Sequence, residues 1–232
     1  MRNIIAQLRL PRKGRMIDYS KLDHWSLKAQ KEGYPARSVY KLKEMDEKFG
    51  LIQAARSGSF PFRVLDLGAA PGSWSLYILR KLINRTKTQG GVGPSLVSID
   101  LSPLSRAYDQ GLFDKPDFVF IQGDFTLCEI RRAVLSHGPY NLLVSDAAPA
   151  TTGNRSLDTL RSLELAEVAL DYAGTVLAQG GNFVVKVFQG GDTANLLKTM
   201  RGLFETAKSF KPQACRSESF ETYYLGLGKK QN

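Results

Sequence analysis

The chain has 232 residues, of which 43% are hydrophobic and 23% charged, as in one globular domain with a substantial core. No apolar run reaches the length of a membrane span. The net charge of +10 favours a polyanionic partner, although solubility alone also explains such a charge. Cys128 and Cys215 have neither metal-ligand nor disulfide-framework spacing, which predicts a reducing compartment. His24 and His137 are isolated in the sequence, which predicts no metal site and no histidine-based catalytic triad.

The first part of the chain is basic. Residues 1–17 carry five arginines and lysines before the first acid, Asp18, and further basic residues up to Arg37 alternate with aromatic ones. Basic side chains suit contact with phosphates, and aromatic side chains suit stacking on bases. We therefore predict that residues 1–37 form a basic arm that contacts RNA and that residues 38–232 form the domain.

Two other interpretations of this arm remain open. Its aromatic residues also suit packing onto the core; they are Tyr19, Trp25, Tyr34 and the adjoining Tyr40. An arginine-rich, acid-poor N-terminus is also typical of a mitochondrial presequence, but this one is poor in serine, and a proline and a glycine interrupt any helix. The segment lacks the long apolar core of a secretory signal.

The spacing of apolar residues predicts a first helix over residues 38–49, with Ser38 as its N-terminal cap. Lys41 lies beside the apolar side of this helix. By itself Lys41 means little, since most lysines on such helices are exposed to solvent.

The segment from Val64 to Gly72 combines a short buried strand with a turn of small residues, and a helix over residues 73–82 follows, with Ser73 as a possible cap. Strand, glycine turn and helix start together are typical of a nucleotide-binding βαβ unit. Asp66, Gly68 and the next glycine at position 72 form a D-x-G-x-x-x-G pattern rather than the dinucleotide G-x-G-x-x-G. The pattern resembles motif I of S-adenosylmethionine (SAM) methyltransferases, although one glycine turn also serves ordinary tight turns.

The rest of the chain alternates predicted strands and helices. Strands are predicted at 96–99, 118–121, 140–144, 182–187, 207–211 and 222–227. Helices are predicted at 127–135, at 163–177 with Gly180-Gly181 ending it, and at 194–204; residues 84–95 read as a flexible loop. This order predicts an α/β fold, a mostly parallel sheet of about seven strands with helices on both faces.

Two aspartates follow predicted strands. Asp100 ends the second strand, and Asp124 follows the third. A carboxylate at the end of the second strand suits the two ribose hydroxyls of an adenosyl ligand, and Asp124 lies where the adenine would fall. Each aspartate also suits a simple turn or helix cap.

Lys186 interrupts an otherwise apolar predicted strand. Burying an ammonium costs several kcal/mol unless a partner compensates it, and Asp146 at the end of the neighbouring strand is a suitable partner. The pair suits a structural ion pair, and it also suits an amine whose pKa is adjusted beside a ligand cleft.

Several motifs occur in a fixed order along the chain: Val39-Tyr-Lys-Leu, Asp66-Leu-Gly-Ala-Ala-Pro-Gly-Ser-Trp-Ser, Gln122-Gly-Asp-Phe, Ser145-Asp-Ala-Ala-Pro, Val184-Val-Lys-Val-Phe-Gln-Gly, Lys211-Pro, Arg216-Ser and Glu221-Thr-Tyr-Tyr. Together they resemble the RrmJ/FtsJ family of SAM-dependent RNA ribose 2′-O-methyltransferases. The resemblance covers nearly the whole chain from about Leu22 onward. It implies a Rossmann-like class I SAM methyltransferase fold.

The resemblance also implies the site residues. The Lys-Asp-Lys-Glu catalytic tetrad of the family falls on Lys41, Asp146, Lys186 and Glu221. The implied cofactor contacts are Asp66, Gly68, Ala69, Pro71, Gly72, Ser73, Trp74, Asp100, Leu101, Asp124, Phe125 and Asp146. SAM is the implied cofactor, and no metal is required.

The chain departs from the family pattern in a few places. The family commonly has Gly at the position of Ser73, Asn at that of Ala150, and Arg-Ser-Arg-Ala where residues 35–38 read Pro-Ala-Arg-Ser. The 84–95 loop is longer than usual. The tetrad and the glycine turn are intact, so these changes bear on which RNA is bound rather than on the chemistry.

The implied reaction is 2′-O-methylation of a ribose in RNA, with Lys186 as base or alkoxide stabiliser; DNA lacks the hydroxyl. The expected substrate is a uridine of large-subunit rRNA within a ribosomal subunit, and tRNA or mitochondrial rRNA is the alternative. A small-molecule or protein methyltransferase and a non-catalytic RNA-binding module are the other classes. We expect a cytoplasmic monomer without membrane contact, with the mitochondrial matrix as the alternative compartment.

Overall fold

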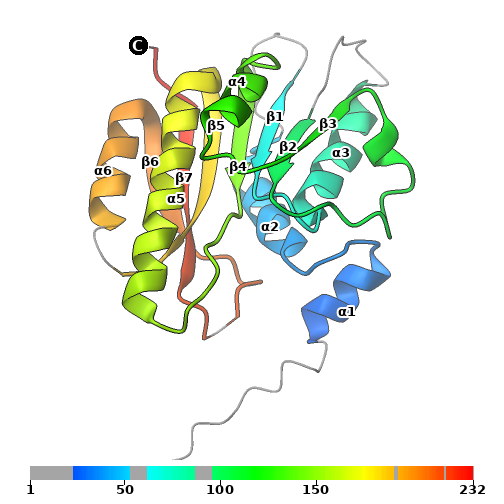
Figure 1. Ribbon diagram of the computed structural model, residues 1–232, viewed down its shortest axis with the longest axis horizontal. Coiled ribbons are helices and arrows are strands. Elements are labelled where there is room, and N and C mark those ends of the chain that lie inside the picture. The colour runs from blue at the N-terminus through cyan, green and yellow to red at the C-terminus, as the bar shows by residue number, and fades with distance from the viewer. Residues whose placement is uncertain (1–22, 53–61, 87–95, 191–192, 217, 232) are drawn as a thin grey trace, which may run out of the picture.

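A seven-stranded sheet forms the centre of the computed structural model, which describes residues 23–52, 62–86, 96–190, 193–216 and 218–231 (Figure 1). The strand order is β3-β2-β1-β4-β5-β7-β6, and β7 runs antiparallel to both of its neighbours. The strands are β1 (Val64–Leu67), β2 (Leu96–Asp100), β3 (Phe118–Gln122), β4 (Tyr140–Ser145), β5 (Leu177–Phe188), β6 (Phe204–Phe210) and β7 (Glu221–Lys229). The predicted mostly parallel α/β fold is confirmed.

Helices cover both faces of the sheet (Figure 1). They are α1 (His24–Lys31), α2 (Val39–Phe49), α3 (Ser73–Thr86), the short 3₁₀ helix η1 (Leu112–Asp114), α4 (Cys128–Leu135), α5 (Arg155–Val176) and α6 (Thr193–Leu203). Residues of α1, α2 and α3 pack on one face, and residues of α5 and α6 pack on the other. The central strands β1 and β4 are therefore buried on both sides, which explains why most of their residues are apolar.

The side chains of Ser38 and Ser73 do not make the capping contacts that were predicted for them. Ser38 stands at the start of α2, but its backbone is already helical and its side chain makes no capping hydrogen bond. Ser73 is the first residue of α3, and its hydroxyl accepts a hydrogen bond of 2.8 Å from the amide of Ala36. The hydroxyl thus joins α3 to the turn before α2 instead of capping its own helix.

The predicted end of the long helix is also wrong. α5 ends at Val176, and Gly180-Gly181 belong to β5, which pairs with β4 from Leu177 and shifts register before Asn182. Glycine permits this shift, because a Cβ at Gly181 would lie 2.9 Å from the carbonyl oxygen of Ala178. α3 in turn runs to Thr86 rather than to residue 82.

Residues 23–37, which the sequence analysis placed in the arm, form α1 and a turn on the core. Ala29 is buried, Trp25 and Tyr34 are partly buried against the core, and Asp23 caps α1 by accepting from the amide of Ser26. These aromatic residues therefore pack onto the domain. Residues 1–22 of the arm and most of the 84–95 loop lie outside the described residues.

A buried carboxylate ties α2 to α3. Asp46 is 1% exposed and accepts hydrogen bonds of 2.8 Å from the hydroxyl of Tyr77 and from the amide of Ile52. The half-exposed ammonium of Lys81 lies 3.5 Å from the same carboxylate. These contacts fix the position of α2, which carries Lys41.

We expect Asp46→Ala to lower the free energy of unfolding by about 3 kcal/mol, because it leaves a buried hydroxyl and amide without an acceptor. Tyr77→Phe removes one of these hydrogen bonds and should cost about 1.5 kcal/mol. Lys81→Ala is the control and should cost under about 1 kcal/mol, since that ion pair is solvent-exposed on the lysine side. Urea unfolding measures all three; equal losses for Asp46→Ala and Lys81→Ala would contradict this account.

Candidate active site

A cavity of about 770 Å³ opens at the carboxyl edge of the parallel strands. Its lining comes from the segments that follow β1, β2, β3 and β4, from one side of α5, and from Lys186 of β5 and Ser38. β1 and β4 are neighbours in the sheet, while the chain continues from β1 to β2 on the other side. The cavity thus lies at the point where the strand order reverses, the usual ligand site of an open α/β sheet.

The glycine turn after β1 forms one wall of this cavity. Gly68 has φ +75°, and a Cβ on it would lie 2.6 Å from the Cα of Ala147. The amide of Ala70 donates a hydrogen bond of 2.9 Å to one carboxylate oxygen of Asp100, whose other oxygen accepts from the amide of Ser102. The turn and the end of β2 are therefore held together, with Asp100 facing the cavity.

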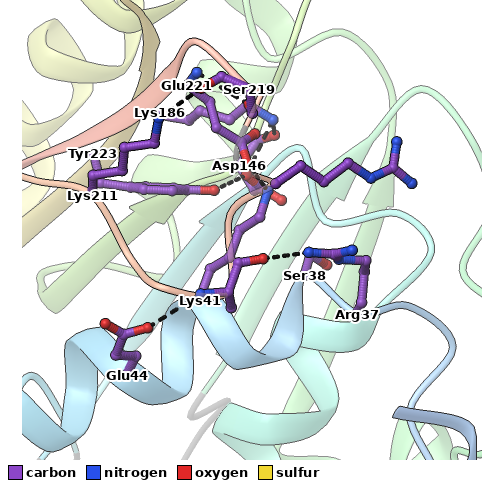
Figure 2. Close-up of polar contacts among 12 residues, drawn as sticks. Arg37, Ser38, Lys41, Glu44, Asp146, Lys186, Lys211, Ser219, Glu221 and Tyr223 are labelled. Atoms are coloured by element: carbon purple, nitrogen blue, oxygen red, sulfur yellow. Dashed lines mark hydrogen bonds and ion pairs between the residues drawn. The ribbon is translucent and has the colours of Figure 1, made fainter. Parts of the chain in front are cut away.

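Four charged side chains meet beside the cavity (Figure 2). The Nζ of Lys186 lies 3.1 Å from Oδ1 of Asp146, and it also donates to the backbone carbonyl of Asp146. The Nζ of Lys41 lies 2.7 Å from Oε1 of Glu221. The fold thus brings together the four residues of the expected tetrad, which come from α2, β5, β7 and the end of β4.

Tyr223 joins the two pairs. Its buried hydroxyl donates a hydrogen bond of 2.7 Å to Oδ1 of Asp146, and its ring lies 5.9 Å from the Nζ of Lys41. Sequence reasoning missed Tyr223, but a signal was available: it lies two residues after Glu221 in a strand, so both side chains point to the same face.

The electrostatics of the cluster follow from burial and charge pairing. Burial raises the pKa of Asp146, but Lys186 and Lys41 outweigh burial and leave the pKa below its usual value. Burial lowers the pKa of Lys41, but Asp146 and Glu221 outweigh it, so the pKa is raised. Burial, Asp146 and Glu221 together raise the pKa of Tyr223 well above its usual value. Asp146 is therefore ionised, and Lys41 and Tyr223 are protonated, at neutral pH.

Comparisons with known proteins show the family of the chain. The sequence profile of the FtsJ-like methyltransferases matches residues 34–229. Ribosomal RNA large subunit methyltransferase E of Treponema denticola is 51% identical over 213 residues, which cover 91% of this chain and 97% of the relative. The protein of the same name from Oleidesulfovibrio alaskensis is 43% identical, with 90% and 92% covered.

The chain belongs to the FtsJ-like methyltransferase family.

Solved structures of methyltransferases resemble this chain in fold. A ribosomal RNA methyltransferase from Plasmodium falciparum is 25% identical with a TM-score of 0.65, over 86% of this chain and all of the other. Human Methyltransferase-like protein 13, solved with SAH, is 9% identical with a TM-score of 0.54, over 82% and 84% of the two chains, and this likeness concerns the fold alone.

The expected cofactor contacts of this FtsJ-like protein fall into two groups. Seven of them line the cavity: Gly68, Pro71, Asp100, Leu101, Asp124, Phe125 and Asp146. The others lie in or behind the wall: Asp66, Ala69, Gly72, Ser73 and Trp74. Trp74 donates its indole N–H to the carbonyl of Ser38 at 2.8 Å, so that it joins α3 to α2. Asp124 accepts from the amide and the hydroxyl of Thr126.

Asp66 is the most unusual residue of the wall. It is fully buried, and burial raises its pKa to about 7 although the hydroxyl of Ser75 donates to it. Its Oδ1 has no hydrogen-bond partner among the residues that the structure describes. The fit to SAM rests instead on the cavity lining, where the small residues Gly68 and Ala70 and the carboxylate of Asp100 suit a polar ligand close to the backbone.

A set of polar contacts holds the segment before β7 against α2. Arg37 donates to the carbonyl of Ala214 at 2.5 Å and pairs with Asp23, and Glu44 accepts from the amide of Gln213 at 2.8 Å. Cys215 of this segment is buried, and burial followed by the charge of Glu221 raises its pKa to about 12. Arg37 therefore holds the segment around Ala214, which precedes Glu221, against the start of α2. Its guanidinium is occupied by contacts within the protein.

Within the described part of the chain, no group of three or more His, Cys, Asp and Glu side chains is arranged to hold a metal ion. No helix there is long and apolar enough to cross a membrane.

We expect Asp100→Ala to weaken SAM binding about tenfold or more, because it removes a cavity carboxylate and releases the glycine turn. Isothermal calorimetry with SAM measures the affinity, and circular dichroism checks that the fold is kept. Asp114→Ala is a matched control, since this carboxylate pairs with Arg106 on the surface. An unchanged affinity of a folded Asp100→Ala variant would remove Asp100 from the cofactor site.

Proposed function

We propose that this protein methylates the 2′-hydroxyl of a ribose in RNA, with SAM as methyl donor, and that the substrate is a uridine of large-subunit rRNA within a ribosomal subunit. The observation that carries the proposal is the cluster of two lysines and two carboxylates, of which Lys186 and Asp146 line the cavity. The names of the bacterial relatives support the choice of large-subunit rRNA.

In the proposed mechanism the bound cofactor supplies an already activated methyl group, and the protein orients the acceptor and manages one proton. Lys186 contacts the ribose hydroxyl: as a neutral amine it accepts the hydroxyl proton, and as an ammonium it stabilises the developing oxyanion. Asp146 holds the Nζ of Lys186 through its carboxylate and its carbonyl. Lys41, protonated and held by Glu221, adds positive charge where the hydroxyl loses its proton.

For the cofactor, Gly68 and its neighbours make room against the backbone, Asp100 accepts from the ribose of SAM, and Asp124 contacts the adenine. Asp66, Ala69, Gly72, Ser73 and Trp74 support this wall. We further propose that residues 1–37 contact RNA through the part before α1, and that the protein is a cytoplasmic monomer.

The experiment that tests the function is transfer of radiolabel from SAM to bulk RNA, DNA and protein in parallel. We expect label in RNA alone, since DNA lacks the 2′-hydroxyl. Ribose-methylation mapping of rRNA and tRNA from a deletion strain then identifies the nucleotide. Label in protein, or a missing methyl group in tRNA instead of rRNA, would refute the activity or the substrate respectively.

Substitution of Lys186 distinguishes a catalytic role of the cluster from a purely structural one. We expect Lys186→Ala to reduce single-turnover methyl transfer at saturating RNA by at least about 100-fold, the contribution of a proton-handling group. Lys186→Arg should fail as well, because a guanidinium stays protonated and its planar head does not fit an ammonium's place. SAM and RNA affinities should stay nearly unchanged.

A purely structural ion pair predicts another pattern. Lys186→Ala would then lower the melting temperature by stranding Asp146 without its partner, while the folded fraction still transferred methyl groups. Lys198→Ala, an exposed lysine on α6, is the control for loss of one positive charge. Substantial transfer by soluble Lys186→Ala would overturn the proposed role, whatever its stability.

A further inference from the structure

An aromatic and arginine pair stands beside the charged cluster and has no part in the mechanism above. The guanidinium carbon of Arg155 lies 5.2 Å from the ring centroid of Phe220, within cation–π range. The ring of Phe188 meets Phe220 in an edge arrangement, with centroids 4.6 Å apart. Arg155 is exposed and Phe220 is half-buried, so the pair forms part of the surface.

The pair is close to the transfer site. Phe220 directly precedes Glu221, and Glu221 pairs with Phe188 in the β5–β7 ladder. Phe188 lies two residues after Lys186 on the same strand, which corresponds to roughly 7 Å. Phe220 contacts Phe188, so the pair lies on the part of the surface next to the strand position of Lys186, where a nucleotide adjoining the methylated one would pass.

The backbone around Phe220 is fixed. Its carbonyl accepts a hydrogen bond of 2.7 Å from the amide of Gln189. The carbonyl of the preceding residue, Ser219, accepts a hydrogen bond of 2.7 Å from the Nζ of Lys211. Arg155 is the first residue of α5, which Asn154 caps through its side chain. A ring held on a fixed backbone loses little conformational entropy when a ligand stacks on it.

We propose that Phe220 and Arg155 form a stacking platform for one unpaired base of the RNA substrate, next to the methylated ribose. The inference rests on the proposed function. Single-stranded RNA is bound by stacking of unstacked bases on aromatic rings and on guanidinium planes, both of which the pair offers.

The platform differs from a phosphate contact in a measurable way. A phosphate contact adds to the salt dependence of binding, whereas stacking on a neutral ring does not. We therefore expect Phe220→Ala to weaken binding of a large-subunit rRNA fragment about tenfold, with an unchanged slope of log K against log salt and an unchanged SAM affinity. Phe220→Trp should bind at least as well as the wild type.

Matched variants separate stacking from packing and from charge. Phe220→Leu keeps an apolar contact for Phe188 but has no ring, so it should lose RNA affinity as Phe220→Ala does and keep the wild-type melting temperature. It also keeps the test open if Phe220→Ala does not fold. Arg155→Lys keeps the charge without the plane and should weaken binding. Arg201→Ala, an exposed arginine on α6, controls for the loss of one charge.

RNA probes with single abasic sites complete the test. After the methylated nucleotide is mapped, abasic sites are introduced at each of its neighbours. One of these should weaken binding to the wild type about tenfold and leave binding to Phe220→Leu unchanged.

Two results would overturn the platform: wild-type affinity of both Phe220→Ala and Phe220→Leu, or full binding by Arg155→Lys with a reduced salt slope for Arg155→Ala. Absence of methyl transfer to RNA by the wild-type protein would instead refute the proposed function itself.

Discussion

The buried ammonium of Lys186 is the constraint on which the rest of the site depends. Lys186 is 8% exposed within a strand whose neighbours are apolar, so its charge requires a partner at hydrogen-bond distance. Asp146 supplies that partner from the end of β4, and Tyr223 supplies a hydrogen bond to the same carboxylate from β7. The antiparallel direction of β7 makes this possible, because an antiparallel strand begins at the edge where the parallel strands end.

The second lysine reaches the site from a different layer. Lys41 belongs to α2, which packs on the sheet face that also holds α3. α2 is held by the Asp46 contacts, by the indole of Trp74 on the carbonyl of Ser38, and by Glu44 on the segment before β7. Residues that the motif assigned to cofactor binding, such as Trp74, thus also set the position of a catalytic candidate.

The sequence was informative where local pattern and chemistry agree. The buried strands, the glycine turn and the Lys186–Asp146 pair follow from apolar runs and from the cost of an unpaired charge, and the structure contains them. Tyr223 was missed because a tyrosine in a buried strand is ordinary until its partner is known. The prediction that Ser73 caps α3 was wrong because its hydroxyl accepts a hydrogen bond from the amide of Ala36, 37 positions away in sequence. Such long-range contacts decide the role of a side chain, and local spacing does not report them.

The charges of the cluster indicate that the residues that attract RNA differ from the residues proposed to carry out the reaction. With Lys186 protonated, Lys41 and Lys186 contribute two positive charges and Asp146 and Glu221 two negative ones, so the cluster is formally neutral. A neutral cluster offers no net attraction to phosphates, and in the proposed mechanism its charges act on the uncharged ribose hydroxyl. The net charge of +10 must therefore lie outside the cluster, where it can raise the local concentration of RNA without disturbing the balance at Lys186. Asp146 belongs to both the cavity wall and the cluster, so it joins the proposed cofactor site to the proposed catalytic lysine.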